Sequence, residues 1–411
     1  MPSSVGPTMI TLGCRLNIAE SDAIRGLLAG RDAVVVNSCA VTNDAVASTR
    51  RAIRRARRDR PGAELIVTGC AAQIDPAAFA AMPEVDRVIG NSDKLNPAAW
   101  ASTEPVVVRE IARVLDTAPQ LSDAFAGQTR AFVEVQNGCD HGCTFCAIPG
   151  GRGPSRSASV DAVVAQVAAL VAGGHGEVVL TGVDLSSYGH DLAEQPPLGT
   201  LVEAILARTS LRRLRLSSLD PAAIDPALFA CVTQEARVMP HAHLSFQAGD
   251  DMVLKRMRRR HSRVDAVRLV ARLKAARGDI AIGADLIAGF PTEDEGMAAN
   301  SRALIDDCDI VHAHVFPYSP RARTPAARMP QVPPPVAKAR AEALRAAAAA
   351  RRTRWLQAQV GAIADVLVER PGTRGHTPGF ADVTLPPSPP GAIVPVRITQ
   401  VEGDRLIGMP L

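Results

Sequence analysis

Residues 139–146 read Cys-Asp-His-Gly-Cys-Thr-Phe-Cys and follow an apolar run, Ala131 to Val135, that predicts a strand. The C-x3-C-x2-C spacing lets one short loop direct three thiolates at a single metal centre. A protein-ligated iron–sulfur cubane takes four cysteine thiolates, so three would leave one iron open to a small chelating ligand. The alternative is a zinc knuckle with His141 as the fourth ligand, although typical zinc sites combine a C-x2–4-C pair with a distant second pair.

The bulk composition points to a soluble protein of several domains. The chain has 411 residues, enough for two or three domains, and its 46 basic and 42 acidic residues leave a net charge of +4. Six of the eight cysteines fall in two groups of three, and an odd group cannot pair internally, which favours metal ligation in a reducing compartment. No signal peptide or run of about 18 apolar residues is apparent, so we expect a cytoplasmic protein without membrane contact.

The first segment, residues 1–125, predicts an open parallel βαβ sheet. Apolar runs at Thr8–Leu12, Ala33–Val36 and Glu64–Val67 alternate with helical stretches at Asn17–Leu28 and Thr42–Arg58. Residues from Pro97 to about Gly127 have weaker periodicity and are interpreted as a connection.

One cysteine follows each of these three strands: Cys14, Cys39 and Cys70. The loops after the carboxyl ends of parallel strands gather at one edge of a sheet. The three sulfurs are therefore expected to converge, although 25 and 31 residues separate them in the sequence. A lone cysteine is more often a small buried apolar residue, but the repeated offset predicts a second cluster with three protein ligands.

The central segment, residues 126–335, predicts a partial or full (β/α) barrel of about six units. Its strand-like runs are Ala131–Val135, Glu177–Leu180, Arg213–Leu216, His243–Phe246, Ile280–Ile287 and Ile310–Phe316. Such barrels carry their chemistry at the carboxyl ends of the strands. Polar or turn residues near these strands predict a cofactor site, although each alone more often serves a loop backbone: Ser217, Gln247, Asp285, Gly289 and Tyr318. Arg152 and Arg156 could meet a phosphate or a carboxylate.

Two arginine-rich runs suggest a polyanionic partner. Arg54 and Arg58 share one face of the second predicted helix, and Arg256 and Arg259 follow the fourth barrel strand. Phosphate contacts from such residues supply affinity without reading sequence. A solvated basic face is the alternative interpretation.

The last segment, residues 336–411, predicts a linking helix over Ala337–Gln359 and then a small β-barrel. Short β-like runs occupy Ala364–Glu369, Gly379–Leu385 and Ile393–Val401, followed by a last stretch, Arg405-Leu-Ile-Gly-Met. Such a module could bind RNA, bind protein or only pack.

Nearly the whole chain resembles the radical S-adenosylmethionine methylthiotransferases, which combine a three-cysteine N-terminal domain, a radical barrel and a TRAM domain. The resemblance is carried by Thr11-Leu-Gly-Cys14-Arg-Leu-Asn17, Asn137-Gly-Cys139 through Cys146, Gly151-Arg-Gly-Pro-Ser-Arg-Ser157, Leu180-Thr-Gly182 and Tyr318-Ser-Pro-Arg321. Within the family it is most similar to members that act on N6-threonylcarbamoyladenosine at tRNA position 37. The members acting on isopentenyladenosine usually read Cys-Gln-Met-Asn at the first site, and those acting on a ribosomal protein usually have Pro-Lys-Asn.

The resemblance implies two [4Fe-4S] clusters and S-adenosylmethionine. The cluster on Cys139, Cys143 and Cys146 would cleave S-adenosylmethionine to a radical that abstracts hydrogen from C2 of the adenine, and the cluster on Cys14, Cys39 and Cys70 would deliver sulfur. The Gly–Glu region ending at Glu177 would contact the methionine amino group. The implied partners are a tRNA anticodon stem-loop, a reductant such as flavodoxin or ferredoxin, and a sulfur source.

Three departures from the family pattern concern substrate contacts. Thr292 and Arg323 stand where glycine is usual, and His376 replaces a common tyrosine. The alternatives are methylthiolation of isopentenyladenosine in tRNA or of a ribosomal protein, and a non-enzymatic iron–sulfur RNA-binding or sensor protein.

Overall fold

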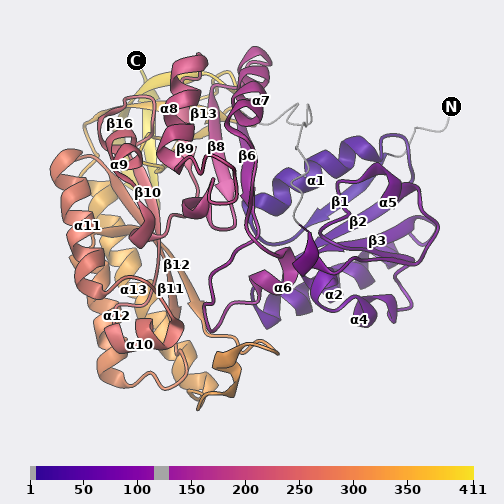
Figure 1. The fold of residues 1–411 in the computed structure, drawn as a ribbon. Helices are drawn as coiled ribbons and strands as arrows, with labels where there is room; N and C mark the ends of the chain where they lie inside the picture. The colour runs from indigo at the N-terminus through magenta and orange to yellow at the C-terminus, as the bar shows by residue number, and fades with distance from the viewer. Residues whose placement is uncertain (1–5, 115–128) are drawn as a thin grey trace.

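The computed structural model describes residues 6–114 and 129–411, which form a sheet with flanking helices, a six-stranded open barrel and a small closed barrel (Figure 1). The elements of the first part are β1 (Thr8–Thr11), α1 (Arg15–Leu27), β2 (Ala33–Ser38), α2 (Asn43–Asp59), β3 (Glu64–Gly69), α3 (Cys70–Ile74), α4 (Pro76–Ala80), β4 (Arg87–Ile89), α5 (Pro97–Ala101) and β5 (Val106–Val107).

The first sheet is parallel throughout, with strand order β1-β2-β3-β4-β5. The predicted βαβαβ order is therefore confirmed for its first three strands. The connection expected from Pro97 onward is wrong in part, because α5 and β5 lie within it. Strands of two or three residues are too short to show a hydrophobic period. The boundary predicted at residue 125 lies outside the described residues.

Alternation along the buried strands places helices on both faces of this sheet. Val34 and Val36 pack with Ile53 of α2 on one face, and Val35 packs with Ile24 of α1 on the other. Because successive side chains of a strand point to opposite faces, a continuous apolar run serves both layers. Helix α2 starts where the Thr42 hydroxyl accepts a hydrogen bond from the Ala45 amide.

The central part is an open barrel of six parallel strands: β6 (Arg130–Asn137), β8 (Glu177–Gly182), β9 (Arg213–Leu216), β10 (His241–Gln247), β11 (Ala281–Ala288) and β12 (Ile310–Pro317). Isolated bridges, including Leu219 to Leu244, join the β6-β8-β9 and β10-β11-β12 groups. All six predicted barrel strands are confirmed. The short β7 (Arg156–Ser157) pairs antiparallel with β6.

Helices cover the outside of the barrel, as Figure 1 shows. Leu244 and Leu286 point into the apolar core beneath these helices, whereas His243 and Asp285 point to the opposite side, which we call the lumen face. The helices of this part are α7 (Val160–Ala172), α8 (Leu198–Arg208), α9 (Pro226–Gln234), α10 (Asp251–Met257), α11 (Arg263–Ala276) and α12 (Glu295–Asp307), and the short α6 (Ile148–Arg152) lies instead toward the first sheet.

The last part is a long helix, α13 (Pro334–Gln357), followed by a closed five-stranded barrel in the order β13-β14-β15-β17-β16. The strands are β13 (Ile363–Glu369), β14 (Arg374–His376), β15 (Asp382–Thr384), β16 (Ile393–Glu402) and β17 (Arg405–Pro410). The predicted small β-barrel is confirmed, but β14 lies outside the predicted runs. Within the described ranges, no helix combines the length and apolarity needed to cross a bilayer.

Candidate functional site

The first cysteine triad lies in the loop after β6. Gly138 begins the loop at φ +76°, and a Cβ there would lie 1.8 Å from the carbonyl oxygen of Pro154, so only glycine fits. The amides of His141 and Ile148 donate to the sulfurs of Cys139 and Cys146, each at 3.4 Å. Arg259 Nη1 lies 3.5 Å from the sulfur of Cys143. The loop thus directs hydrogen-bond donors at all three sulfurs.

Burial favours the neutral form of two thiols of this triad. It raises the pKa of Cys139 to about 12 and that of Cys146 to about 11, against the pull of the amide donors. A thiolate in such a place needs a positive partner, and metal coordination supplies one by deprotonating the thiol outright. The donor set therefore suits metal ligation.

The second triad gathers at one edge of the first sheet, as the repeated offset after β1, β2 and β3 predicts. A Cβ on Gly13 would lie 2.9 Å from the sulfur of Cys39, which places the residue before Cys14 directly against Cys39. Burial raises the pKa of Cys39, and negative charge on Cys70 or Cys14 raises it further. The three sulfurs therefore interact electrostatically.

Spacing within the triads argues against single zinc ions. Among the described residues, the one group of three His, Cys, Asp or Glu with ligand atoms all within 4.8 Å of one another contains no cysteine. Tetrahedral zinc with sulfur at about 2.3 Å would bring its thiolates to about 3.8 Å apart. A cluster of several irons holds its ligands at separate corners and accepts wider spacing. The zinc-knuckle alternative is thus disfavoured for the first triad.

Helix α6 connects the two triads. It begins two residues after Cys146, and a Cβ on Gly151 at its other end would lie 3.2 Å from Cys70 Cβ. The Asn91 side-chain amide donates to the sulfur of Cys70 at 3.5 Å and also to the Gly151 carbonyl. At about 1.5 Å of rise per residue, the path from Ile148 to Gly151 spans about 4.5 Å. The triads are therefore neighbours, and Figure 1 shows α6 where the first sheet meets the barrel.

A buried ion cluster fixes this junction. Arg152, the last residue of α6, donates to both carboxylate oxygens of Glu20 at 2.8 and 3.1 Å and to Asn17 Oδ1 at 2.7 Å. Lys94 Nζ lies 2.5 Å from the same carboxylate, and all three charged side chains are at most 2% exposed. Arg152 thus meets a carboxylate, the second of its two predicted partners, and ties the cysteine loop to α1.

The predicted S-adenosylmethionine contacts divide into two groups. Ser217, Gln247 and Tyr318 lie at the same strand ends as the first triad. Ser217 Oγ is buried without a hydrogen-bond partner among the residues described, so its hydroxyl is free to form a hydrogen bond with a ligand. Gln247 sits at a bulge with φ +68°, a strained position for a residue that is not glycine. The ring of Tyr318 packs edge-on against Phe290 at 5.5 Å.

Glu177 corrects the prediction, whereas the cofactor contact of Gly289 stays a prediction. Glu177 begins β8 opposite Arg130, at the far end of the strands from the cysteine loop. Burial would raise its pKa, but Arg215 and Arg130 outweigh burial and lower it to about 2. Its carboxylate therefore neutralises arginines rather than reaching a ligand beside the loop. Gly289 is required by packing, because a Cβ there would lie 2.3 Å from Ala337 Cβ of α13.

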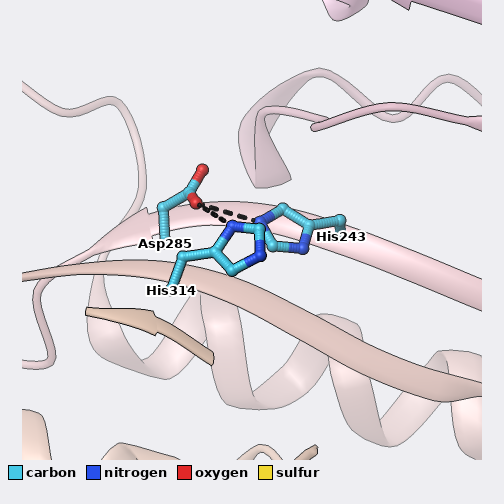
Figure 2. A group of neighbouring side chains, drawn as sticks. All are labelled: His243, Asp285 and His314. Carbon is cyan, nitrogen blue, oxygen red and sulfur yellow. Dashed lines mark hydrogen bonds and ion pairs between the residues drawn. The ribbon is translucent and has the colours of Figure 1, made fainter. Parts of the chain in front are cut away.

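Asp285 belongs to a lumen-face cluster that the sequence analysis did not identify. Its Oδ1 lies 3.0 Å from His243 Nε2 and 3.1 Å from His314 Nδ1 (Figure 2). Burial would raise the pKa of Asp285, but these hydrogen bonds hold it well below its usual value. The triplet His-Ala-His, which occurs at 241–243 and again at 312–314, is the signal that could have revealed the cluster.

The predicted RNA-contacting arginines also divide. Arg54 and Arg58 are exposed on α2, and Arg54 has only a 3.8 Å ion pair with Glu84. Arg256 instead donates to the Thr292 carbonyl at 3.2 Å. Arg259 is buried and binds Asp220, Ser245 and the sulfur of Cys143. These contacts correct the prediction for Arg259, whose side chain is 7% exposed and stabilises the cysteine loop. Arg256 is half-buried, and its RNA contact stays a prediction.

Comparisons with known proteins agree with this arrangement. Residues 133–305 match the Radical SAM superfamily, and residues 7–90 match the uncharacterized protein family UPF0004. The threonylcarbamoyladenosine tRNA methylthiotransferase MtaB of Rickettsia prowazekii is 45% identical over 94% of this chain and 92% of its own length. The chain belongs to the radical S-adenosylmethionine methylthiotransferases.

Other members of this methylthiotransferase family are more distant. The MtaB of Bacillus subtilis is 34% identical over 78% of this chain and 74% of its own. The tRNA-2-methylthio-N(6)-dimethylallyladenosine synthase of Anaeromyxobacter dehalogenans is 34% identical over 97% of this chain and 92% of its own. The solved radical S-adenosylmethionine methyltransferase TsrM of Kitasatospora setae shares the fold, with a TM-score of 0.52 and 18% identity over 72% of this chain and 64% of its own.

Proposed function

We propose that this enzyme adds a methylthio group to C2 of N6-threonylcarbamoyladenosine at position 37 of tRNA. The observation that carries the proposal is the 45% identity, over nearly the full length of both chains, to a relative named for that substrate. The relative named for dimethylallyladenosine is less similar, at 34%.

The chain's residues divide the work between two neighbouring sites. Cys139, Cys143 and Cys146 would hold one [4Fe-4S] cluster, and Cys14, Cys39 and Cys70 a second. When bound, the clusters and S-adenosylmethionine supply the radical and the sulfur, while the protein positions them and excludes competing reactions. Arg259 places positive charge at Cys143, and the unpartnered Ser217 hydroxyl is available to a bound ligand.

The proposed reaction sets the partners. The tRNA anticodon stem-loop would cross the face where the two triads meet. Exposed Arg54 and Arg58, on the half of α2 farther from the cysteines, would contact phosphates farther along the stem. A low-potential electron donor and a sulfur source must meet the same protein in the cytoplasm. The closed β-barrel has the position in the chain expected of a TRAM domain.

Mass spectrometry of tRNA nucleosides tests the proposal. A strain lacking this enzyme should lose 2-methylthio-N6-threonylcarbamoyladenosine and retain the unmethylthiolated nucleoside. Loss of the dimethylallyl methylthio product instead would reassign the substrate. An unchanged nucleoside profile would reject tRNA as the substrate.

Iron counting on anaerobically prepared protein tests the two sites separately. The full protein should bind about eight irons, two cubanes of four. Cys39→Ala should bind about half as much and still form 5′-deoxyadenosine from S-adenosylmethionine, whereas Cys231→Ala, at a buried cysteine outside both triads, should match the parent. Four irons in the parent protein would contradict the second cluster.

A further inference from the structure

Arg15, the residue after Cys14, places its guanidinium group in the lumen of the barrel. Its guanidinium carbon lies 5.6 Å from the ring centre of Phe380, a residue of the closed β-barrel. Arg130 and Arg215 approach the same ring at 5.0 and 4.9 Å. One aromatic side chain therefore gathers three guanidinium groups at the end of the lumen opposite the cysteine loop.

Arg15 differs from its two neighbours in having no anionic partner. Arg130 pairs with Glu177 and, at 2.8 Å, with Glu369. Arg215 pairs with Glu177 at 2.9 Å and donates to two backbone carbonyls. The Arg15 side chain makes no hydrogen bond or ion pair with any of residues 6–114 or 129–411. Asp285 and Glu177 act on Arg15 only through space, and each of these carboxylates is already bonded to other side chains.

The lumen face is accessible to a ligand beside this cation. On β12, His314 has 58% of its side chain exposed and Phe316 is 39% exposed, although both lie on the face turned away from the apolar core. Asp285 is a lumen carboxylate that acts on Arg15 electrostatically, but its Oδ1 is bonded to two imidazoles. These bonds reduce its repulsion of an incoming anion.

We propose that Arg15 is a specificity-determining residue that binds the carboxylate of the N6-threonylcarbamoyl group. This inference rests on the proposed function. The carboxylate is the one anionic group on the modified base, and a guanidinium binds it through two parallel hydrogen bonds. C2, the position that receives sulfur, and C6, which carries N6, are atoms of the same adenine ring. Cys14 and Arg15 are adjacent in the chain, so one bound base could meet both side chains. An apolar dimethylallyl group would leave Arg15 unpaired, which gives the site a means of rejecting it.

The first test uses the unaltered enzyme and two synthetic anticodon stem-loops, one with the free threonylcarbamoyl acid and one with its methyl ester. The ester removes the charge and keeps the shape. The acid should bind about 10- to 100-fold more tightly, the range for a charged hydrogen-bonded pair. Equal affinity for acid and ester would overturn the proposal. If the enzyme methylthiolates neither stem-loop, the proposed function itself fails, so the two failures are distinguishable.

The second test asks whether Arg15 is the group that reads the charge. Arg15→Gln should bring the acid-to-ester ratio of kcat/KM close to one, and Arg15→Lys should restore part of it. Arg268→Gln, on the exposed surface of α11, should keep the parent ratio. Since a loss of folding lowers both rates together, the ratio separates recognition from a structural role. An unchanged ratio in Arg15→Gln would assign the discrimination elsewhere and refute the role of Arg15.

Discussion

Replacing Glu20 by glutamine should destabilise the junction between the first sheet and the barrel. The Glu20 side chain is fully buried and binds Arg152 at 2.8 and 3.1 Å and Lys94 at 2.5 Å, and both cations are 2% exposed. Glutamine keeps the shape but leaves two buried cations beside neutral amides. Breaking a buried ion pair in this way costs about 3–5 kcal/mol. We expect the lower end of that range, because burial already lowers the pKa of Lys94 and lets it release its proton.

Urea unfolding followed by Trp100 fluorescence measures this loss. The Trp100 indole donates to the Lys94 carbonyl at 2.8 Å, so it reports on the same region, and a Trp355→Phe background removes the other tryptophan signal. Glu20→Gln with Lys94→Met should recover part of the stability by removing one unpaired cation. Glu110→Gln, at an exposed ion pair with Arg113, should change the free energy of unfolding by less than about 1 kcal/mol. A Glu20→Gln loss as small as that of the control would refute the reasoning.

Two further predictions concern departures from the family pattern. Thr292 and Arg323 have φ of +65° and +72°, a left-handed conformation that costs a non-glycine residue about 1–2 kcal/mol. Thr292→Gly should therefore raise the free energy of unfolding by about 0.5–1 kcal/mol after the entropy cost of glycine, and Thr292→Ala should not; denaturant titration decides. His376 lies 3.1 Å from both Glu369 and Asp382, which raise its pKa against the effect of burial. Its stabilisation should be complete below the unfolded pKa of about 6.5 and lost as pH rises through the higher folded value. Melting temperatures should show this slope in the parent and not in His376→Tyr; equal slopes would contradict it.

The sequence predicted those features that depend on local pattern. Apolar runs in the sequence, and their periodicity, located the six barrel strands and the first three strands of the N-terminal sheet. The repeated offset of Cys14, Cys39 and Cys70 predicted the second triad because parallel strands bring their carboxyl ends together. Short strands such as β4 and β5 carry too few residues to show a period.

Side-chain partners could not be predicted in the same way, because the tertiary fold sets them. The prediction placed Glu177 at the carboxyl ends of the barrel strands, but Glu177 is the first residue of β8 and lies at the amino ends. Arg259 lies in an arginine-rich run but is buried against Cys143. Arg15 shows no pattern of its own, and only the packing of Phe380 reveals its position.

The brevity of α6 has a consequence for how this chain can vary. Helix α6 has five residues and leads from the cysteine loop to Arg152, its last residue. Each residue turns a helix by about 100°. One inserted residue would rotate the Arg152 guanidinium away from Glu20 and move Gly151 away from Cys70. Surface loops tolerate insertions, but in this segment the number of residues is fixed by geometry, independently of which amino acids fill it.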